Sequence, residues 1–307
     1  MNKLWWLSLT ILCLAGAGFL ILKMLPNQDI ATTTLPTGPD RIVSLAPNLT
    51  EILFALGLGE KVVAVSSDSD YPPEAANKNK VGTFWQPNTE AIIASKPDLV
   101  ITEWFEQQKT VAETLKRLGY KVLTLRIETI EELLASIKAV GAATGAQNRA
   151  DQLVEDITNR LNNLRLKLAG TNKVKVLWVV QTEPLRVAGR NTFLNELLEL
   201  VGGENAIGPT IQQYPPLSTE ELLASAADII IQSAMTTDNI HAEQQAAEMF
   251  WSKRRELPAV KNNRIYVIDP DTTLRLGPRL CQGLELVARC LHPDIDRNQP
   301  ETAAGIK

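Results

Sequence analysis

Short apolar runs alternate with amphipathic stretches along most of the chain. The runs at 41–45, 61–66 and 121–126 are rich in branched residues and predict strands, because a strand covered on both faces needs continuous apolar sequence. The stretches 107–118 and 129–143 carry apolar side chains at three- and four-residue steps and predict helices. This alternation predicts an α/β fold with mostly parallel sheets and helices on both faces.

One unit of this pattern occurs twice. Residues 90–101 and 220–231 each begin with a glutamate, continue through two branched apolar residues and an Ala-Ser step, and reach an aspartate followed by apolar residues. Each copy predicts a short helix that runs into a buried strand. Residues 50–60 and 195–204 add a weaker echo, an amphipathic helix closed by glycines. Two echoes in the same order indicate two lobes of one architecture.

Between the two halves, residues 147–169 carry a leucine-rich stripe with helical period and predict one helix of about 30 Å or more. The chain therefore divides into predicted segments: an N-terminal signal peptide or membrane anchor (1–23), a linker (24–40), an N-terminal α/β lobe (41–146), an inter-lobe backbone helix (147–170), a C-terminal α/β lobe (171–292) and a flexible tail (293–307).

The N-terminal segment has a composition of its own. Nineteen uncharged residues lie between Lys3 and Lys23, a length typical of a signal peptide or of an uncleaved membrane span. Small residues at 15–17 could be cleaved, whereas the apolar sequence that continues beyond them favours a span. Lipidation at Cys13 is a further alternative, although Leu12 stands where a small residue is expected. Each alternative exports the rest of the chain to the periplasm or another extracytoplasmic space, either tethered to the cytoplasmic membrane or secreted.

Composition excludes several classes of protein. A net charge of −4 without a basic run argues against a nucleic-acid binder. The sequence has no glycine-rich phosphate loop and no nucleophile elbow, and His241 and His292 lie too far apart to indicate a metal or acid–base site. Cys281 and Cys290 fall nine residues apart in a predicted helix, which favours two buried thiols over a disulfide. We predict no metal site.

Aromatic and charged side chains gather in loops that follow predicted strands, where open α/β sheets bind ligands. Aromatic rings there can bury flat ligand faces, and arginines can pair with anionic groups. A single loop aromatic can also cover the edge of a core, but four of them on corresponding loops of two lobes favour a ligand site. The predicted ligand-binding residues are Asp68, Tyr71, Phe84, Trp85, Trp104, Arg186, Tyr214, Asp271 and Arg275.

Glu90 and Glu220 stand in the first turn of the repeated helix. Asn88 and Ser218 are the predicted N-caps, and Ser218 forms a capping box with Glu221, which leaves Glu220 without a local role. Two interpretations remain. The glutamates stabilise the helix dipole, a contribution of about 0.3–1 kcal/mol each, or they form a matched pair that docks on basic residues of a partner.

The chain resembles the periplasmic cobalamin and iron–siderophore binding proteins of ABC importers, and most of all their cobalamin-binding members. The motifs that carry this resemblance lie at 41–51, 67–73, 87–90 and 96–101, and the similarity extends over about residues 40–292. It implies two Rossmann-like lobes joined by one long helix, a ligand in the cleft between them, little hinge closure and no catalytic step. It also implies that Glu90 and Glu220 dock on arginines of the membrane permease.

The resemblance carries over to the pocket only in part. Phe84 and Tyr214 stand at positions where cobalamin binders place Trp residues around the corrin ring. Glu103 stands at a third such position, with Trp104 adjacent to it. Asp271 matches an acidic residue of the last loop.

Two further substitutions make the predicted site more charged than the family pattern. Asp68 replaces a Tyr and Arg186 replaces a Phe. A ligand with carboxylates, such as a siderophore, haem or a modified corrinoid, would suit Arg186 and Arg275.

We therefore expect a solute-binding protein that captures a metal chelate, first of all cobalamin or a related corrinoid, and delivers it to an ABC permease with its ATPase. It needs no intrinsic cofactor and acts as a monomer attached to the membrane by its N-terminal segment. The alternatives are a siderophore- or haem-binding protein of the same fold and, more remotely, a membrane-anchored α/β enzyme.

Overall fold

The computed structural model describes residues 38–235 and 237–294. The predicted signal or anchor, Cys13, most of the linker and nearly all of the predicted tail lie outside these ranges. The described residues belong to one compact unit that starts at Gly38. Within them, no helix combines the length and the apolar character that a membrane crossing requires.

The N-terminal lobe contains a five-stranded parallel sheet in the order β3-β2-β1-β4-β5. Because the chain adds strands first on one side of β1 and then on the other, the strand order reverses between β1 and β4. The strands are β1 (Ile42–Ser44), β2 (Val62–Val65), β3 (Asn79–Lys80), β4 (Leu99–Glu103) and β5 (Val122–Leu125). The helices are α2 (Pro47–Ala55), η1 (Gly59–Lys61), α3 (Pro73–Ala76), α4 (Thr89–Ala94), α5 (Glu106–Arg117) and α6 (Ile130–Thr144).

The C-terminal lobe contains a sheet in the order β10-β9-β6-β7, with β8 paired to the first part of β6. All pairs are parallel except the hairpin of β6 and β7, and the order reverses between β6 and β9. The strands are β6 (Val174–Thr182), β7 (Leu185–Val187), β8 (Gly203–Asn205), β9 (Ile229–Ser233) and β10 (Ile265–Ile268). The helices are α8 (Phe193–Leu200), α9 (Thr219–Ser225), η2 (Thr237–Asn239), α10 (Ile240–Trp251), α11 (Pro258–Lys261), α12 (Pro270–Thr273) and α13 (Leu280–Leu291).

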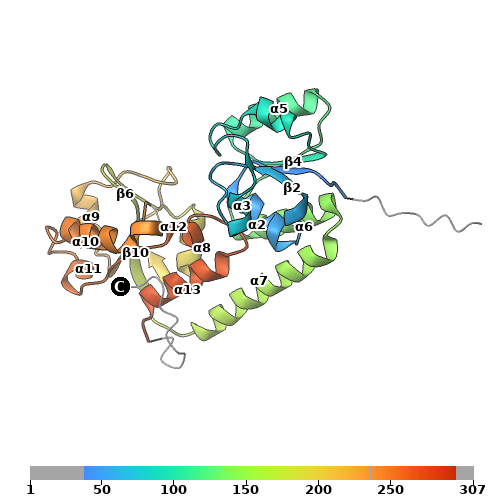
Figure 1. Cartoon of the computed structure of the whole chain (residues 1–307). Helices are drawn as coiled ribbons and strands as arrows, with labels where there is room; N and C mark the ends of the chain where they lie inside the picture. Colours follow the sequence, from blue (N-terminus) through green and yellow to red (C-terminus); the bar gives the residue numbers. More distant parts are fainter. Residues whose placement is uncertain (1–37, 236, 295–307) are drawn as a thin grey trace, which may run out of the picture. The chain divides into compact units, whose positions relative to one another are not determined.

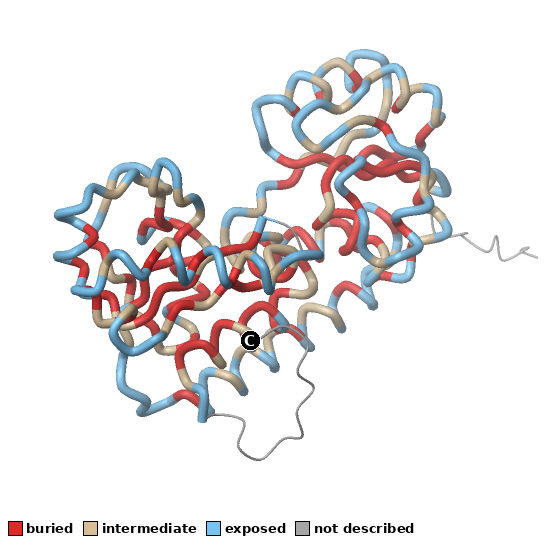
Figure 2. Tube along the Cα trace, turned by 60° about the vertical axis from the view of Figure 1, so that its left-hand side comes forward, coloured by how far each residue is buried: buried red, intermediate tan, exposed pale blue. Residues whose placement is uncertain are grey.

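The long helix α7 (Gln147–Lys167) joins the two lobes, as predicted (Figure 1). It packs against α6 of the first lobe and against α8 and α13 of the second. Arg160 of α7 pairs with Glu285 of α13 at 2.8 Å. One cluster of buried apolar side chains extends from Ile42 through Ile157 of α7 to Val176, so the lobes share part of their core. Figure 2 shows the buried residues concentrated along the strands and the exposed ones on the outer helices.

The sequence prediction missed the shortest elements. The elements β7, β8, α3, β3 and α12 have no counterpart among the strands and helices predicted from sequence. Strands of two or three residues and single-turn helices are too short to establish a period of their own. The predicted thiols are correct, since Cys281 and Cys290 are both buried and free.

The sequence repeat is also a repeat of backbone conformation. Helix α4 ends at Ala94, two residues before Lys96, and α9 ends at Ser225, immediately before Ala226. Lys96 and Ala226 both have a left-handed backbone, with φ of +46° and +44°. The weaker echo holds in the same way, because Gly57 and Gly202 close α2 and α8 with φ of +69° and +77°. The two lobes therefore use the same turn at each equivalent position.

The repeated aspartates have the same structural role in the two lobes. Asp98 accepts a hydrogen bond from the backbone N–H of Arg41 at 2.9 Å and returns its own N–H to the Arg41 carbonyl at 2.8 Å. Asp228 exchanges the same two bonds with Lys175, at 3.1 and 2.9 Å. Each aspartate thus ties the start of β4 or β9 to the start of the neighbouring strand.

Candidate functional site

The carboxyl edges of the two sheets face each other across the boundary between the lobes. All strands of a parallel sheet end at one edge, so the loops after β1, β2 and β4 lie together. Asn48, just after β1, donates to the carbonyl of Leu276, which follows β10, at 3.3 Å. Asp70, after β2, pairs with Arg275 of the same C-terminal segment. The predicted ligand-binding loops therefore border this boundary.

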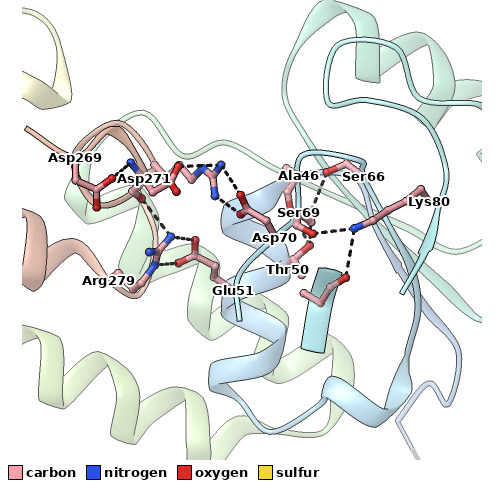
Figure 3. Close-up of polar contacts among 12 residues, drawn as sticks. Ala46, Thr50, Glu51, Ser66, Ser69, Asp70, Lys80, Asp269, Asp271 and Arg279 are labelled. Atoms are coloured by element: carbon pink, nitrogen blue, oxygen red, sulfur yellow. Dashed lines mark hydrogen bonds and ion pairs between the residues drawn. The ribbon is translucent and has the colours of Figure 1, made fainter. Parts of the chain in front are cut away.

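A largely buried ion pair joins the two lobes (Figure 3). Arg279, at the start of α13, donates two hydrogen bonds to the carboxylate of Glu51 on α2, at 2.6 and 2.9 Å. Burial raises the pKa of Glu51 more than the pairing with Arg279 lowers it. Arg279 also stacks on Tyr71, with its guanidinium carbon 4.0 Å from the ring centroid. Tyr71 is thus held in the boundary by an arginine of the other lobe.

Arg275 makes a second bridge beside the first. It pairs with Asp70 of the N-terminal lobe at 2.6 Å and with Asp271 of its own lobe at 3.0 Å. Burial of Asp70 opposes ionisation, but the hydrogen bond and the charge of Arg275, with smaller contributions from a backbone hydrogen bond and from Arg279, together hold the pKa of Asp70 below its ordinary value. Burial raises the pKa of Asp271, although Arg275 opposes that rise. Two of the predicted ligand residues, Asp271 and Arg275, are therefore already paired with each other.

The predicted aromatic residues of the N-terminal lobe form a cluster. The rings of Phe84 and Trp85 meet edge to face at 4.8 Å, and Phe105 meets both of them, at 5.1 and 5.8 Å. Trp85 keeps 58% of its surface exposed and Trp104, next to Phe105, keeps 59%. Such exposure is unusual for indoles and leaves broad apolar faces available at the carboxyl ends of β3 and β4.

Two polar side chains hold this aromatic cluster in place. The backbone N–H of Phe84 donates to Asp68 at 2.6 Å, so this predicted ligand residue anchors the aromatic loop. The side chain of Gln108, fully buried on α5, donates to the carbonyls of Phe84 and Leu45 and accepts from the backbone N–H of Glu103. Gln108 therefore links the aromatic loop to the ends of β1 and β4.

In the C-terminal lobe, the predicted residues Arg186 and Tyr214 lie together. Arg186, on β7, donates from Nη1 to the carbonyl of Tyr214 at 2.9 Å. Both side chains are half-buried, and burial raises the pKa of Tyr214. The guanidinium of Arg186 is thus engaged with the backbone.

A buried carboxyl group lies at the reversal point of the first sheet. Glu103, the last residue of β4, is 6% exposed and accepts a hydrogen bond from Asn48. Burial raises its pKa to about 7, although the hydrogen bond from Asn48 opposes the rise. Glu103 is therefore largely neutral below neutral pH.

The structure gathers the predicted ligand residues into three groups: the aromatic cluster with Asp68 and Trp104, the bridge with Tyr71, Asp271 and Arg275, and the pair Arg186 and Tyr214. In the described ranges, no hydrogen bond, ion pair or ring contact joins one group to another. The sequence analysis did not single out Phe105, Gln108 or the pair of Glu51 with Arg279. The position of Phe105 beside Trp104 could have indicated its role from sequence. The roles of Gln108, Glu51 and Arg279 depend on partners far away in the sequence, which no local pattern reveals.

The two repeated glutamates are exposed and capped as predicted. Asn88 accepts from the N–H of Ala91, and Ser218 and Glu221 form a complete capping box. Glu90 and Glu220 occupy the second position of α4 and α9, and neither forms a hydrogen bond or ion pair with any residue in the described part of the chain. Because α4 and α9 lead into β4 and β9, their first turns lie toward the carboxyl edges of the sheets.

The sequence matches the family model described as periplasmic binding protein over residues 42–272. The chain belongs to this family. It is 35% identical, over 87% of its length and 84% of the relative's, to a Bacillus subtilis protein described as an uncharacterised ABC transporter substrate-binding lipoprotein. It is 32% identical to the vitamin B12-binding protein of Vibrio parahaemolyticus, over 81% of this chain and 91% of that protein.

Solved structures agree with this assignment. The periplasmic vitamin B12-binding protein of Vibrio cholerae superposes with a TM-score of 0.74, at 28% identity, over 86% of this chain and 100% of that one. The periplasmic haem-binding protein of Roseiflexus sp. RS-1 superposes with a TM-score of 0.73, also at 28% identity, over 84% and 100%. The two-lobed α/β fold expected from sequence is confirmed, whereas the two similarities are too close to distinguish a ligand.

This family member is a substrate-binding component of an ABC transporter and not an enzyme, which excludes the remote alternative of an α/β enzyme. It works with a membrane permease and an ATPase and carries a small-molecule substrate.

Proposed function

We propose that the protein captures cobalamin or a closely related corrinoid at the boundary between its lobes and hands it to the permease. The choice of cobalamin over a ligand with carboxylates rests on the ion pairs that its arginines already form. Arg275 and Arg279, which could receive the carboxylates of a ligand, already pair with Asp70, Asp271 and Glu51.

Charge at the boundary favours a chelate without carboxylates. Three acidic residues surround two arginines there, and Arg186 is committed to the carbonyl of Tyr214. A ligand carboxylate would have to displace one of these partners, and a displaced carboxylate would lose its charged partner. The corrin ring of cobalamin carries amide side chains, which avoid this cost, whereas haem carries two propionates. The presence of Arg186 and Arg275 in the predicted site is therefore a weaker argument for a ligand with carboxylates.

Exposed aromatic surface supports the same proposal. Phe84, Trp85 and Phe105 form a packed cluster, and Trp85 and Trp104 keep more than half of their surface exposed. A large ring system can stack on such faces, and each buried aromatic contact adds substantial apolar area.

The alternative ligand is haem or a ferric siderophore, bound at the same boundary between the lobes. The similarity to a haem-binding protein favours it, since its TM-score and identity nearly equal those of the cobalamin binder. Arg275 and Arg279 would then exchange their protein carboxylates for those of the ligand.

The proposal extends to the docking surface and the location. Glu90 and Glu220 are exposed, equivalent and without partners among the residues that the structure describes, which suits two contacts with basic residues of the permease. We place the protein outside the cytoplasm as a monomer, tethered through its N-terminal segment; the lipoprotein description of the Bacillus subtilis relative supports this placement.

The ligand can be identified by titration. The full chain in phospholipid nanodiscs is titrated with cobalamin, haem and a ferric siderophore while tryptophan fluorescence is recorded, with empty nanodiscs as the blank. Quenching by cobalamin with a Kd below about 1 µM supports the proposal. Quenching only by haem or only by the siderophore replaces the ligand, and no quenching by any of the three removes the basis for a chelate receptor.

A further inference from the structure

The repeated unit places one more pair of side chains at equivalent positions. Strands β4 and β9 both have five residues; Phe105 is the second residue after β4, and Met235 is the second residue after β9. The equivalence also holds on the other side of the unit. Phe84 and Tyr214 each stand four residues before the N-cap of the repeated helix. The loops on both sides of the unit are therefore equivalent in the two lobes.

The contacts of these loops support the equivalence. The carbonyl of Phe84 accepts from the Gln108 side chain at 3.1 Å, and the carbonyl of Tyr214 accepts from the Arg186 side chain at 2.9 Å. Both rings also pack against the same apolar cluster that extends through the two lobes. Each lobe thus presents an anchored aromatic side chain at the same place.

Phe105 and Met235 each stand where the strand order of a sheet reverses. β4 pairs with β1 and β9 pairs with β6, and these are the two reversal points. Ligands of open α/β sheets bind outside the carboxyl ends of strands at such points. Met235 is 84% exposed, while its backbone N–H is fixed by a 2.8 Å bond to Glu243. The backbone of Met235 is therefore fixed while its thioether stays free to contact a ligand.

We propose that Met235 contacts the ligand from the C-terminal lobe, as the counterpart of Phe105 in the N-terminal lobe. This inference rests on the proposed binding function. The thioether is flexible and polarizable and packs well against conjugated rings, so it suits the apolar face of a macrocyclic metal chelate. Its lack of charge also fits a site whose arginines are already paired.

Methionine oxidation tests this contact on the unaltered chain. Met249 is the internal control, because it is 68% exposed and lies in the last turn of α10. Helix α10 follows β9 and leads to β10, so its last turn lies at the amino edge of the sheet, opposite to Met235; Figure 1 shows α10 beside β10. The two methionines therefore share a lobe, are both exposed, and differ in the edge that they occupy.

The full chain is treated with hydrogen peroxide with and without saturating cobalamin, and sulfoxide is measured by mass spectrometry. Cleavage after glutamate separates Met235, in the peptide 222–243, from Met249, in the peptide 249–256. We expect the ligand to slow oxidation of Met235 and to leave Met249 unchanged. Equal protection of both residues, or of neither, with ligand bound overturns the inference.

Variants separate this inference from the function on which it rests. Met235→Ala should weaken cobalamin binding about tenfold, because the contact loses most of its apolar area. Met249→Ala should bind like the original chain, and Met235→Leu should retain most of the affinity. If the original chain binds cobalamin and Met235→Ala binds equally well, the inference fails alone. If the original chain binds no cobalamin, haem or siderophore, the proposed function fails.

Discussion

Glu51 and Arg279 join the two lobes through a bidentate ion pair that solvent hardly reaches. Their side chains are 2% and 12% exposed, and the residues are 228 positions apart in sequence. A second contact between the lobes, a hydrogen bond from the backbone to a glutamate, lies at the equivalent place. Glu196, on α8, accepts from the backbone N–H of Ile130 at the start of α6, at 3.0 Å. Each lobe thus contacts the first turn of the last helix of the other lobe through a glutamate.

The first prediction concerns the stability of this boundary. Arg279→Met leaves the buried carboxylate of Glu51 without its partner and should lower the free energy of unfolding by about 3–5 kcal/mol. The double variant Glu51→Leu with Arg279→Met should recover most of that loss. Urea denaturation measures both. Arg126→Met, which removes an exposed ion pair with Glu128, is the control and should change little. A double variant as unstable as Arg279→Met would contradict the buried-charge explanation.

The second prediction follows from the raised pKa of Glu103. Its ordinary value is 4.5 and its value in the folded chain is about 7, so between these values the folded state binds more protons than the unfolded state. The contribution of Glu103 to stability is therefore fully present below about pH 4.5 and is lost as the pH rises through about 7. Glu103→Gln keeps an acceptor for Asn48 and should remove this part of the pH dependence. Urea denaturation of the original chain and of Glu103→Gln at pH 5 and pH 8 measures this difference. An equal change in unfolding free energy between the two pH values in both proteins would contradict the prediction.

The third prediction concerns Gln108. Gln108→Leu leaves the carbonyls of Leu45 and Phe84 and the N–H of Glu103 without their buried partner, which should cost about 3 kcal/mol of unfolding free energy. It should also weaken ligand binding, because the aromatic loop loses its anchor. Gln107→Leu, at the exposed neighbouring position, is the matched control. A ligand affinity that is unchanged in a folded Gln108→Leu variant would separate this anchor from the site.

The fourth prediction concerns docking. Reversal of charge at Glu90 and Glu220 to lysine should abolish uptake of the ligand through the transporter and leave the affinity of the isolated protein unchanged, because both side chains lack partners within the described ranges. Glu131→Lys, also an exposed glutamate in a first helical turn, is the control. Lost ligand affinity in the double variant would place these glutamates in the binding site.

Much of this fold follows from local sequence. The repeated unit, the caps at Asn88 and Ser218 and the long helix α7 depend on neighbours within a few residues, and the structure confirms them. Two-residue and three-residue elements such as β3 and β7 escaped prediction, since they are too short to establish a period of their own.

The candidate site was less accessible to sequence reasoning. Tyr71, Arg275 and Trp85 were predicted as ligand contacts from their loops alone, and these roles stay predictions. The pairing of Arg275 with Asp70 joins residues 205 positions apart, and only the three-dimensional arrangement reveals that this arginine is occupied. Arg186 and Arg275 therefore left a carboxylate-bearing ligand open as an alternative to cobalamin, whereas the observed pairs favour a ligand without carboxylates.

The most direct test of the proposed function is calorimetric titration of the full chain with cobalamin and, in parallel, with haem. The account predicts a one-to-one complex with cobalamin, with a Kd below about 1 µM and at least about tenfold tighter than that of haem. Haem binding of equal or greater strength, or no detectable heat with cobalamin, would contradict it.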